Sequence, residues 1–513
     1  MNDFHISGRG AILSLLCLTA IVAVMSAGSV QEDRKPVSEG HQIDIQTYLG
    51  DGIDGIRDVD VDDEGNIYAT GGVTNTLGLP NSLQPEFGGR QDVIVLKISR
   101  EGKLLWWRLI GGPNHDRAYA VEVGPDGAVY LAGRAGEGFP TTTGVVQPQF
   151  GGDIESRPGS LYGRQDGFLA KLDREGKLLW SSYFGGKGDD FIRDIDVDDR
   201  GVIHVAATSV SFPFPHIPKT GKSTHSGRHD GVIARVGTDG KAVLWAVYIG
   251  GSGDDFEGPS IRVDREGNTY AAGSTNSTDL KVKNAFQEAP GGQFDLHLVK
   301  YGPNGEMLWH TYIGGPKDEG TETHMLAVDK HGSPVVGITT LSSSGLPVTE
   351  KSYDRTFNGA GGAGTGHFTN YPGDVYLIKY SPDGKRIMGS TYFGGRFGEG
   401  IEGINVDEDG NVYLSGATYS PDLPVVAPVQ ERLNGAPDYF AAKFSPDLSR
   451  LIFSTFLGGN GWDAGRTSAI GRDGTFVISG EAHSTDIPAK GAQIAPAGRG
   501  GKDNAVLVVL RRK

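Results

Sequence analysis

Short runs of alternating hydrophobic and polar residues recur along the whole chain, separated by residues that form turns. Between residues 258 and 313 four such runs follow one another: "GPSIRVD", "NTYAAG", "DLHLVKY" and "MLWHTYI". A period of two over five to seven residues, bounded by Gly, Asp and Asn, is typical of short β-strands. The pattern therefore predicts units of four strands and almost no helix.

The four-strand unit occurs seven times. Each copy ends its fourth run with a glycine, and 61 to 80 residues separate successive members of the series Gly50, Gly111, Gly185, Gly250, Gly314, Gly394 and Gly458. Antiparallel units repeated at this period are typical of a propeller, in which radial repetition leaves only short, protected strand edges. We predict an all-β fold, a seven-bladed β-propeller of four-stranded antiparallel blades over residues 44–513.

The two ends of the chain predict how the ring closes. Residues 44–50, "DIQTYLG", have the pattern of a fourth strand without the three before it, and residues 503–510, "DNAVLVVL", have that of a third strand without the fourth. An open solenoid would need a polar cap at each end, and neither end has one. We expect the N-terminal strand to complete the last blade.

The connections between the runs differ in chemistry. Those between the first and second runs, such as "DREG" at 264–267, and between the third and fourth, such as "DREGK" at 173–177, combine Asp with Gly as tight hairpins do. The other connections are long and varied. Because successive connections of antiparallel strands lie at opposite ends, tight turns gather on one face, the turn face, and long connections on the other, the loop face.

The repeated motifs resemble those of a known family. They are a "GG-x-x-x-D" element, "VDxxGNxYxxG", a "D-hydrophobic-x-x-K" strand and an "LLWxTYxGG" strand, and together they cover residues 44 to 513. This pattern resembles the SBBP family, the seven-bladed β-propeller repeat of bacterial secreted and surface proteins. The resemblance implies the fold and an extracellular setting, and it brings no general catalytic motif. The fifth unit has "VDKHGSPVVG" at 328–337, without the Asn and Tyr, so we expect a looser edge there.

The N-terminal residues have the pattern of an export signal. Arg9 precedes the apolar run "AILSLLCLTAIVAVMSA" at 11–27, and a polar stretch follows. We predict a cleaved signal peptide over 1–27 and a linker over 28–43, with a retained membrane anchor as the alternative. The one cysteine, Cys17, lies in this run, so the mature chain would contain no disulfide. We expect a secreted, periplasmic or cell-surface protein without a membrane span after cleavage.

Composition narrows the possible partners. Lys and Arg total 48 against 63 for Asp and Glu, a net charge of −15, which provides no electrostatic reason to bind nucleic acid. The 80 glycines have no Gly-X-Y period, which excludes collagen. No G-x-S-x-G, H-E-x-x-H or phosphate-loop pattern occurs, so we expect no cofactor and no catalytic residue of these classes. We expect a monomer whose partner is a protein or glycan.

Two series of acidic residues repeat around the predicted ring. One follows the terminal glycines and comprises Asp54, Asp116, Asp190, Asp255, Glu319, Glu399 and Asp463. The other opens the third strands and comprises Asp92, Asp166, Asp230, Asp295, Asp374, Asp438 and Asp503. The first series could encircle the channel mouth and hold a cation. Presence in every unit favours a structural role for both, in which the carboxylates accept backbone N–H bonds.

Two further features of the repeats have structural interpretations. The acidic tight turns lack the distal glutamate of a calcium loop, so we expect no calcium there. A tryptophan recurs at one position of the fourth strand in four units, and we interpret these residues as packing between blades: Trp106, Trp180, Trp245 and Trp309.

Function should lie where the copies differ, and three long connections on the loop face are exceptional. They span residues 151–165, 212–229 and 358–373, and they carry the candidate ligand-binding residues Tyr162, Arg164, His216, His225, His229, His367 and Tyr371. The three histidines of the second loop could bind a metal, although their spacing fits no zinc signature, so we assign no metal site. We interpret the chain as a non-catalytic binding or scaffold module. A propeller-fold polysaccharide lyase is the alternative, and insertions without function remain possible.

Overall fold

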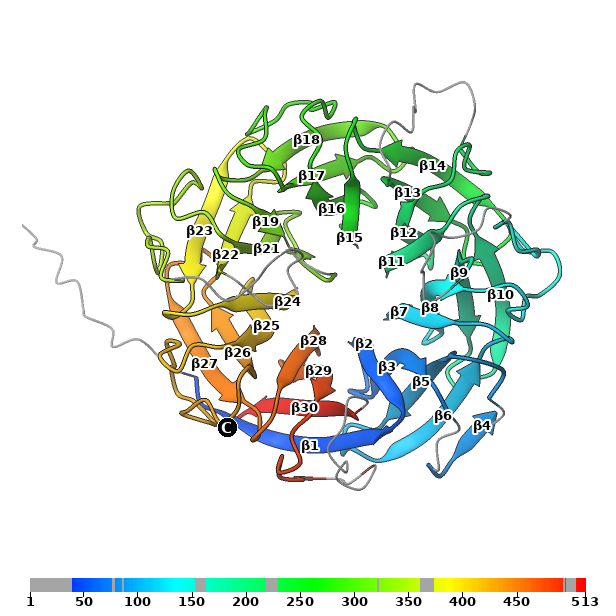
Figure 1. Cartoon of the computed structure of the whole chain (residues 1–513), viewed down its shortest axis with the longest axis horizontal. Helices are drawn as coiled ribbons and strands as arrows, with labels where there is room; N and C mark the ends of the chain where they lie inside the picture. Colours follow the sequence, from blue (N-terminus) through cyan, green and yellow to red (C-terminus); the bar gives the residue numbers. More distant parts are fainter. Residues whose placement is uncertain are drawn as a thin grey trace, which may run out of the picture. The chain divides into compact units, whose positions relative to one another are not determined.

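The computed structural model describes residues 39–75, 79–84, 87–152, 163–217, 229–320, 323–359, 373–491, 494 and 504–513. These residues form seven β-sheets arranged in a ring (Figure 1), and we call the centre of this ring, which the innermost strands surround, the channel. The described residues contain no helix. The predicted seven-bladed, all-β fold is therefore confirmed.

Each blade has four antiparallel strands that run outward from the channel, and we number the blades along the chain from one to seven. The innermost strands are β2 (Ile53–Val61), β7 (Arg117–Val123), β11 (Asp190–Val197), β15 (Asp255–Val263), the divided β19 (Glu319–Gly320) and β20 (Leu326–Val328), β24 (Glu399–Val406) and β28 (Asp463–Ile470). The second strands are β3 (Ile67–Val73), β8 (Val129–Ala135), β12 (Ile203–Ser209), β16 (Thr269–Thr275), β21 (Pro334–Thr340), β25 (Val412–Thr418) and β29 (Phe476–Ala482).

The outer half of each blade follows the same order. The third strands are β5 (Asp92–Ile98), β9 (Asp166–Leu172), β13 (Asp230–Val236), β17 (Asp295–Tyr301), β22 (Asp374–Tyr380), β26 (Asp438–Phe444) and β30 (Asn504–Arg512). The outermost strands are β6 (Leu104–Ile110), β10 (Leu178–Phe184), β14 (Val243–Ile249), β18 (Met307–Ile313), β23 (Ile387–Phe393), β27 (Leu451–Leu457) and β1 (His41–Asp51). Blade one also has β4 (Ser82–Gln84), parallel to β6.

The N-terminal strand closes the ring, as expected. β1 pairs antiparallel with β30, from His41 opposite Arg512 to Asp51 opposite Asn504. The strand begins three residues before the expected start at 44. The Glu39 carboxylate lies 2.6 Å from Lys443 Nζ on β26, so this segment also contacts blade six.

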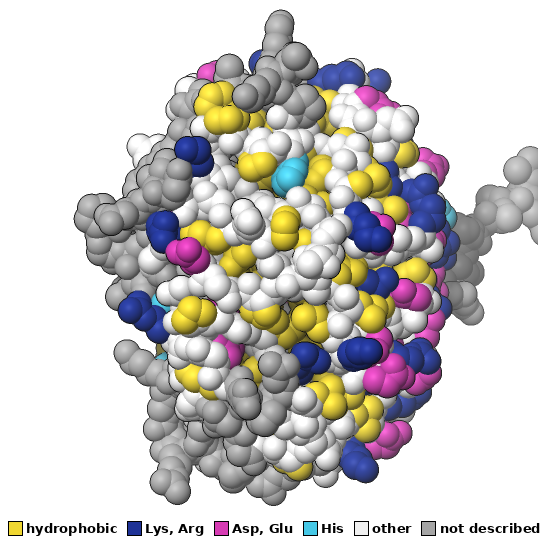
Figure 2. All heavy atoms as spheres, turned by 90° about the vertical axis from the view of Figure 1, so that its right-hand side faces the viewer, with side chains coloured by type: hydrophobic (Ala, Val, Ile, Leu, Met, Phe, Trp, Pro, Cys, Tyr) yellow, Lys and Arg dark blue, Asp and Glu magenta, His cyan; other side chains and the backbone are white. Residues whose placement is uncertain are grey.

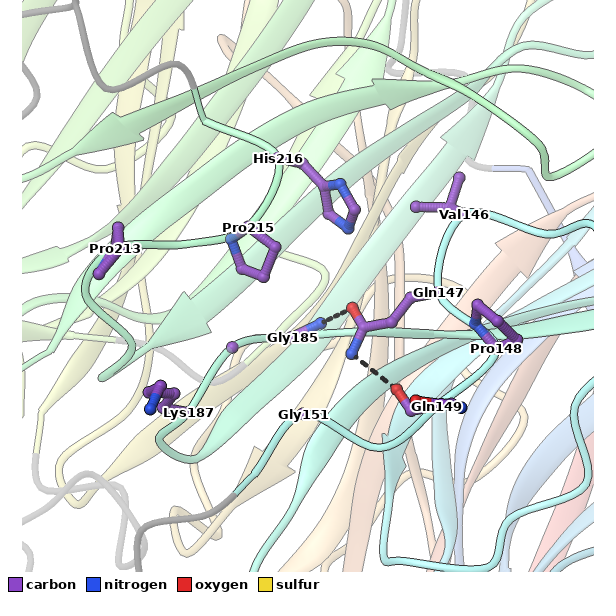
Figure 3. Close-up of a pocket in the computed structure, with 11 residues that line it drawn as sticks. Val146, Gln147, Pro148, Gln149, Gly151, Gly185, Lys187, Pro213, Pro215 and His216 are labelled. Carbon is purple, nitrogen blue, oxygen red and sulfur yellow. Dashed lines mark hydrogen bonds between the residues drawn. The ribbon is translucent and has the colours of Figure 1, made fainter.

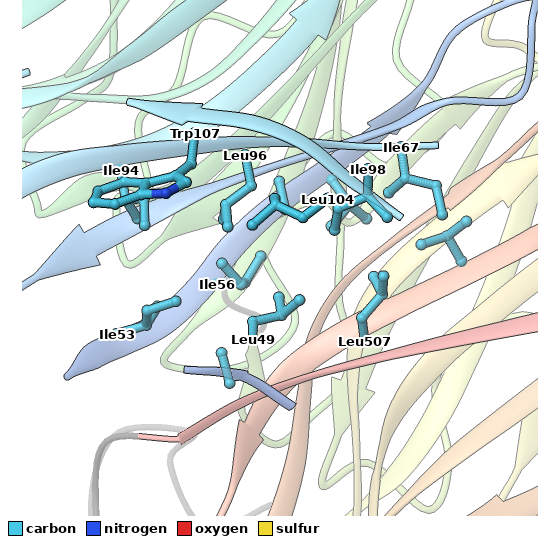
Figure 4. Close-up of a cluster of buried hydrophobic side chains, with 14 of the residues drawn as sticks. Leu49, Ile53, Ile56, Ile67, Ile94, Leu96, Ile98, Leu104, Trp107 and Leu507 are labelled. Carbon is cyan, nitrogen blue, oxygen red and sulfur yellow. The ribbon is translucent and has the colours of Figure 1, made fainter. Parts of the chain in front are cut away.

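The hydrophobic core lies between neighbouring blades. At the closure, Leu49 of β1 and Leu507 of β30 pack with Ile53 and Ile56 of β2 and with other fully buried side chains of blade one (Figure 4). Apolar area removed from water stabilises a fold in proportion to that area. Blades seven and one are therefore joined by core packing, in addition to the pairing of β1 with β30 within blade seven.

The "VDxxGNxYxxG" motif builds the tight turn of its blade. In blade four the Asp264 carboxylate accepts hydrogen bonds from the Asn268 backbone N–H (2.9 Å) and the Tyr270 hydroxyl (3.1 Å). Lys300 Nζ, on the neighbouring strand, lies 3.3 Å from the same carboxylate and 4.6 Å from the Tyr270 ring centroid. These motif residues therefore hold the first three strands of a blade in register.

The recurring tryptophans of blades one to four each contact the next blade, which confirms their interpretation as packing residues. Trp309 Nε1 donates to the Pro382 carbonyl (3.0 Å) in the tight turn of blade five. Its ring leaves no room for a side chain at Gly384, where an added Cβ would lie 2.7 Å from the indole. Gly384 also has φ +71°, a conformation that favours glycine.

Blade five departs from the repeat in its innermost strand, which leads into the motif at 328–337 where the sequence predicted a looser edge. Nine positions separate Glu319 from Val328, against seven between Asp190 and Val197, and the inner strand is divided in two. The extra residues bring His324 across the channel, with Nε2 3.7 Å from Asp58 and Nδ1 3.7 Å from Asp194. His324 is 3% exposed, so side chains fill the centre of the ring at this level.

The outer surface is unevenly charged. The tight turns of blades two and three carry exposed residues of both signs, including Arg174, Glu175, Asp199, Arg200 and Lys241. In side view, charged side chains gather along one edge of the ring, whereas the outer wall is mostly uncharged (Figure 2). The described part of the chain has no helix of the length and hydrophobicity needed to cross a membrane.

Closure by β1 predicts which leucines on outermost strands matter for stability. Leu49 of β1 is fully buried, whereas Leu244 of β14 is 53% exposed. We expect Leu49→Ala to lower the free energy of unfolding by about 2–5 kcal/mol, because it leaves a cavity in the core between blades seven and one. Leu244→Ala should have little effect. Thermal and denaturant unfolding measure both variants.

A truncation tests closure directly. A chain that begins at residue 52 should melt well below one that begins at residue 39, because the edge of β30 loses its partner. Equal melting temperatures of the two truncated chains would show that β1 does not hold the ring closed.

Candidate functional site

A cavity of about 520 Å³ opens on the loop face between blades two and three. Figure 3 shows Pro213, Pro215 and His216, which follow β12, on one side of it, and residues 146–149, which precede β9, on the other. The connection from β10 to β11, at residues 185–187, lies between them. Three connections of two adjacent blades therefore form the site.

The Gln147 side chain fixes the cavity wall to its floor. Its Oε1 accepts a hydrogen bond from the Gly185 N–H (3.0 Å), and its Nε2 donates to the Gln149 carbonyl (3.2 Å) (Figure 3). Nε2 also lies 3.3 Å from the Asp166 carboxylate. These bonds use both ends of the amide, so Gln147 shapes the cavity and offers a ligand little hydrogen-bonding capacity.

Two buried carboxyl groups support the floor from below. Asp166 accepts the Gly151 N–H, and Asp190 accepts the Gly186 N–H, each at 2.6 Å. Burial raises the pKa of Asp166 to about 8, assisted by the neighbouring charge of Asp190, and burial raises the pKa of Asp190 to about 6. The Ser211 hydroxyl donates to Asp190 as well (2.6 Å). These carboxyl groups hold backbone and do not face the cavity.

His216 is the distinctive side chain of the cavity wall. Its ring stacks on Phe184 (centroids 5.5 Å apart, planes at 19°) and contacts the edge of Phe214. Burial lowers its pKa, so the imidazole is neutral at pH 7. Its Nε2 is buried without a hydrogen-bond partner among the described residues. A neutral imidazole held in this way can offer a ligand an aromatic surface.

The repeated acids around the ring have the same arrangement as Asp190. Each accepts the N–H of the second glycine of its "GG" pair at 2.6–3.0 Å, and each is fully buried: Asp116, Asp190, Asp255, Glu319, Glu399 and Asp463. A ring of exposed carboxylates at the channel mouth is therefore not formed by these six. The side chain of Asp54 lies outside the described residues.

The acids that open the third strands are also buried: Asp92, Asp166, Asp230, Asp295, Asp374 and Asp438. Five of them accept backbone N–H bonds from the preceding long connection, as Asp92 does from Gly88 and Asp438 from Asn434, both at 2.7 Å. Asp503 lies outside the described residues. We call the connection from one blade to the next a crossing. Each described crossing therefore has two buried carboxyl groups, one from the third strand of the blade before it and one from the innermost strand of the blade after it.

The other candidate ligand residues are placed in part. Arg164 donates to the Gly152 carbonyl (3.0 Å) and to Glu137 Oε2 (2.9 Å), and His229 Nδ1 lies 3.4 Å from Asp254 Oδ1. Of the seven candidates, His216 lines the cavity, whereas Arg164 and His229 pair with acids nearby. Tyr162, His225, His367 and Tyr371 lie outside the described residues.

No metal centre occurs in the described ranges. No three His, Cys, Asp or Glu side chains there come together in a geometry that could hold an ion. The hypothesis of a three-histidine site also involves His225, so it remains untested.

Sequence analysis missed Gln147, although the repeats contain a signal for it. Gln287 has the equivalent place in blade four, where its Oε1 accepts the Gly314 N–H (3.2 Å), and it lines a second cavity of about 450 Å³ with Gly315 and Pro347. A cavity beside this glutamine is therefore a feature of the repeat. At blades two and three the cavity is also lined by His216 and Lys187.

Comparison with known proteins identifies the repeat. Residues 244–281, which include β15 and β16, match the model of the SBBP family, described as a beta-propeller repeat. The resemblance seen in the repeated motifs is thus confirmed. No curated protein matches the chain.

Several solved structures are similar to this chain at low scores. A protein of unknown function from Dyadobacter fermentans has a TM-score of 0.43 and 10% identity, covering 92% of this chain and 100% of its own. The WD40 β-propeller domain of Doa1 has a TM-score of 0.44 and 9% identity, covering 92% of this chain and 97% of its own. An ulvan lyase of a polysaccharide lyase family has a TM-score of 0.42 and 10% identity, covering 91% of this chain and 97% of its own. These similarities are too low to transfer a function.

The buried carboxyl groups predict an unusual pH dependence of stability. The folded-state pKa is raised to about 8 in Asp166 and Glu399 and to about 7 in Asp116, Glu319 and Asp374, in each case mainly by burial. A raised pKa means that the folded state binds protons more tightly than the unfolded state. The contribution of these groups to the free energy of unfolding is full below about pH 4. It decreases by roughly 1.4 kcal/mol per pH unit for each group as the pH rises toward that group's folded-state pKa.

Denaturant unfolding between pH 4 and 8 measures this slope. Asp166→Asn, which keeps the side-chain shape and removes the titration, should make the slope shallower. The control is Asp239→Asn, at an exposed tight-turn acid whose side chain is 57% exposed. A slope that is the same in wild type and Asp166→Asn would contradict the assignment.

Proposed function

Because the chain carries the SBBP beta-propeller repeat, we propose that it is a non-catalytic binding module of the cell exterior that holds a protein or glycan ligand between blades two and three. The observation that carries the proposal is His216, a stacked, neutral histidine in the wall of a cavity of about 520 Å³. Cavities of roughly 300–1,000 Å³ on a rigid scaffold are typical ligand sites.

The chemistry of the cavity supports a ligand that presents a ring. Pro213, Pro215 and Val146 offer apolar surface, and His216 adds an aromatic ring whose position is fixed by Phe184. Sugar rings, proline and aromatic side chains have an apolar face that packs on such surfaces. Lys187, which is exposed at the rim, favours a ligand with some negative charge.

The same chemistry supports binding rather than catalysis. General acid–base catalysis needs titratable groups that reach the reacting atoms. Among the described residues that line the cavity, His216 and Lys187 are the titratable ones, and no carboxyl group lines it. Asp166 and Asp190 are buried beneath the floor and are engaged by backbone N–H groups.

The exterior location is part of the proposal and is supported by the N-terminal sequence. The apolar run at residues 11–27, after Arg9, is typical of an export signal. A mature chain without cysteine folds independently of the redox state of its surroundings.

The experiment is a binding screen with the full mature chain against a glycan array and a library of peptides rich in proline and aromatic residues. For any ligand found, we expect His216→Ala to weaken binding about tenfold or more, because the ring lies in the wall of the cavity. His331→Ala, at an exposed histidine of the turn face, is the matched control. Pro215→Ala tests the same wall without a titratable group.

The outcomes separate the alternatives. Equal affinity of wild type and His216→Ala for every ligand found would place binding elsewhere and overturn the proposal. Uronate polymers are assayed in parallel, and ultraviolet absorbance from an unsaturated sugar product would identify the chain as a lyase instead.

A further inference from the structure

Three arginine side chains surround one tyrosine where blades two and three meet the channel. The guanidinium carbons of Arg193, Arg134 and Arg117 lie 4.6, 5.7 and 5.9 Å from the Tyr119 ring centroid. Arg134 and Arg193 each also lie 5.7 Å from the ring of Phe191. We refer to these five residues, Arg117, Tyr119, Arg134, Phe191 and Arg193, as the arginine cluster.

The cluster lies at the loop-face end of the channel. β7 and β11, which carry Tyr119 and Arg193, are innermost strands (Figure 1). Both strands begin directly after a crossing between blades, and β8 ends at the long connection of blade two, so Arg117 and Arg134 pair at the loop-face end of their strands. This mouth is the part of a propeller channel that long connections surround.

The field at Tyr119 is strongly positive. Burial alone would raise the pKa of Tyr119, but Arg134, Arg193, Arg117 and Arg57 together lower it to about 7. The pKa of the nearby His115 is lowered by burial and by the charges of Arg134, Arg90 and Arg117. The position therefore favours a negative charge, even at a group that is ordinarily neutral at pH 7.

Two described acids near the cluster, Asp116 and Glu481, are engaged by other groups. Asp116 is fully buried and accepts the N–H groups of Gly112 and Gly136. Glu481 lies 3.3 Å from Arg57 and 3.4 Å from Arg466. Arg193 contacts the two aromatic rings, and its buried Nε has no hydrogen-bond partner among the described residues. A buried donor of this kind ordinarily has an acceptor.

We propose that the arginine cluster is a binding site for an oxyanion, the carboxylate, sulfate or phosphate group of a ligand that enters the channel mouth from the loop face. A guanidinium donates two parallel hydrogen bonds to such groups. The rings of Tyr119 and Phe191 support the Arg193 guanidinium and hold it in place. The Tyr119 hydroxyl adds a donor when it is protonated. The site is separate from the cavity at His216 and does not depend on it.

The phenolate of Tyr119 and a bound anion compete for the same positive field. Binding of an oxyanion therefore makes ionisation of Tyr119 harder and should move its titration to higher pH. This coupling provides a spectroscopic signal that a purely structural cluster would not produce.

The first test is an ultraviolet titration of tyrosinate absorbance from pH 6 to 9, with wild type and Tyr119→Phe. We expect one ionisation near pH 7 in wild type that is absent from the variant. Sodium sulfate or citrate should move this step to higher pH, and sodium chloride at equal ionic strength should move it less. A titration that is the same in the two proteins, or equal shifts with all three salts, would overturn the proposal.

The second test measures affinity by calorimetry, with sulfate, phosphate, citrate and a uronate oligosaccharide as probes. Arg193→Gln should weaken binding of the preferred probe at least tenfold, whereas Arg200→Gln, at an exposed arginine of the turn face, should not. Thermal melting shows that both variants are folded. The ranking of the probes identifies which oxyanion the site takes, and equal affinity of Arg193→Gln and wild type would overturn the proposal.

Discussion

The hydrogen bond from a glycine N–H to a buried carboxyl group, made where the chain crosses from one blade to the next, is the interaction on which this propeller depends. A crossing must turn sharply without burying backbone groups that lack partners, because an unsatisfied buried N–H is costly. The carboxyl group supplies the acceptor, as Asp190 does for Gly186. The hydroxyls of Ser209 and Ser211 donate to the same carboxyl group and tie the crossing to the second strand of the next blade.

Repetition of this interaction explains why the loop face can vary. The buried acid at the start of the third strand anchors the preceding long connection, as Asp166 does by accepting the Gly151 N–H. The length of the segment between these two residues therefore affects the blade little. The floor of the cavity is made of these fixed parts, and the walls are made of the variable ones. Function can therefore change from blade to blade while the crossings remain the same.

The loop face combines two opposite electrostatic environments. At the crossings, burial raises the pKa of carboxyl groups such as those of Asp166 and Glu399, so these acids carry less negative charge at neutral pH than composition suggests. At the channel mouth, arginines from two blades lie around Tyr119. A chain with a net charge of −15 thus has a positive local field at Tyr119.

The number of blades, the closing strand and the two faces could be predicted from sequence, because strand period and turn chemistry are local properties that repeat seven times. His216 was also found, because its loop differs from the equivalent loops. Gln147 and Tyr119 were not, since "VVQPQF" and "RAYAVEV" read as ordinary connection and strand. Their roles come from neighbours distant in sequence, Gly185 for Gln147 and Arg193 for Tyr119, which only the packing of adjacent blades brings close.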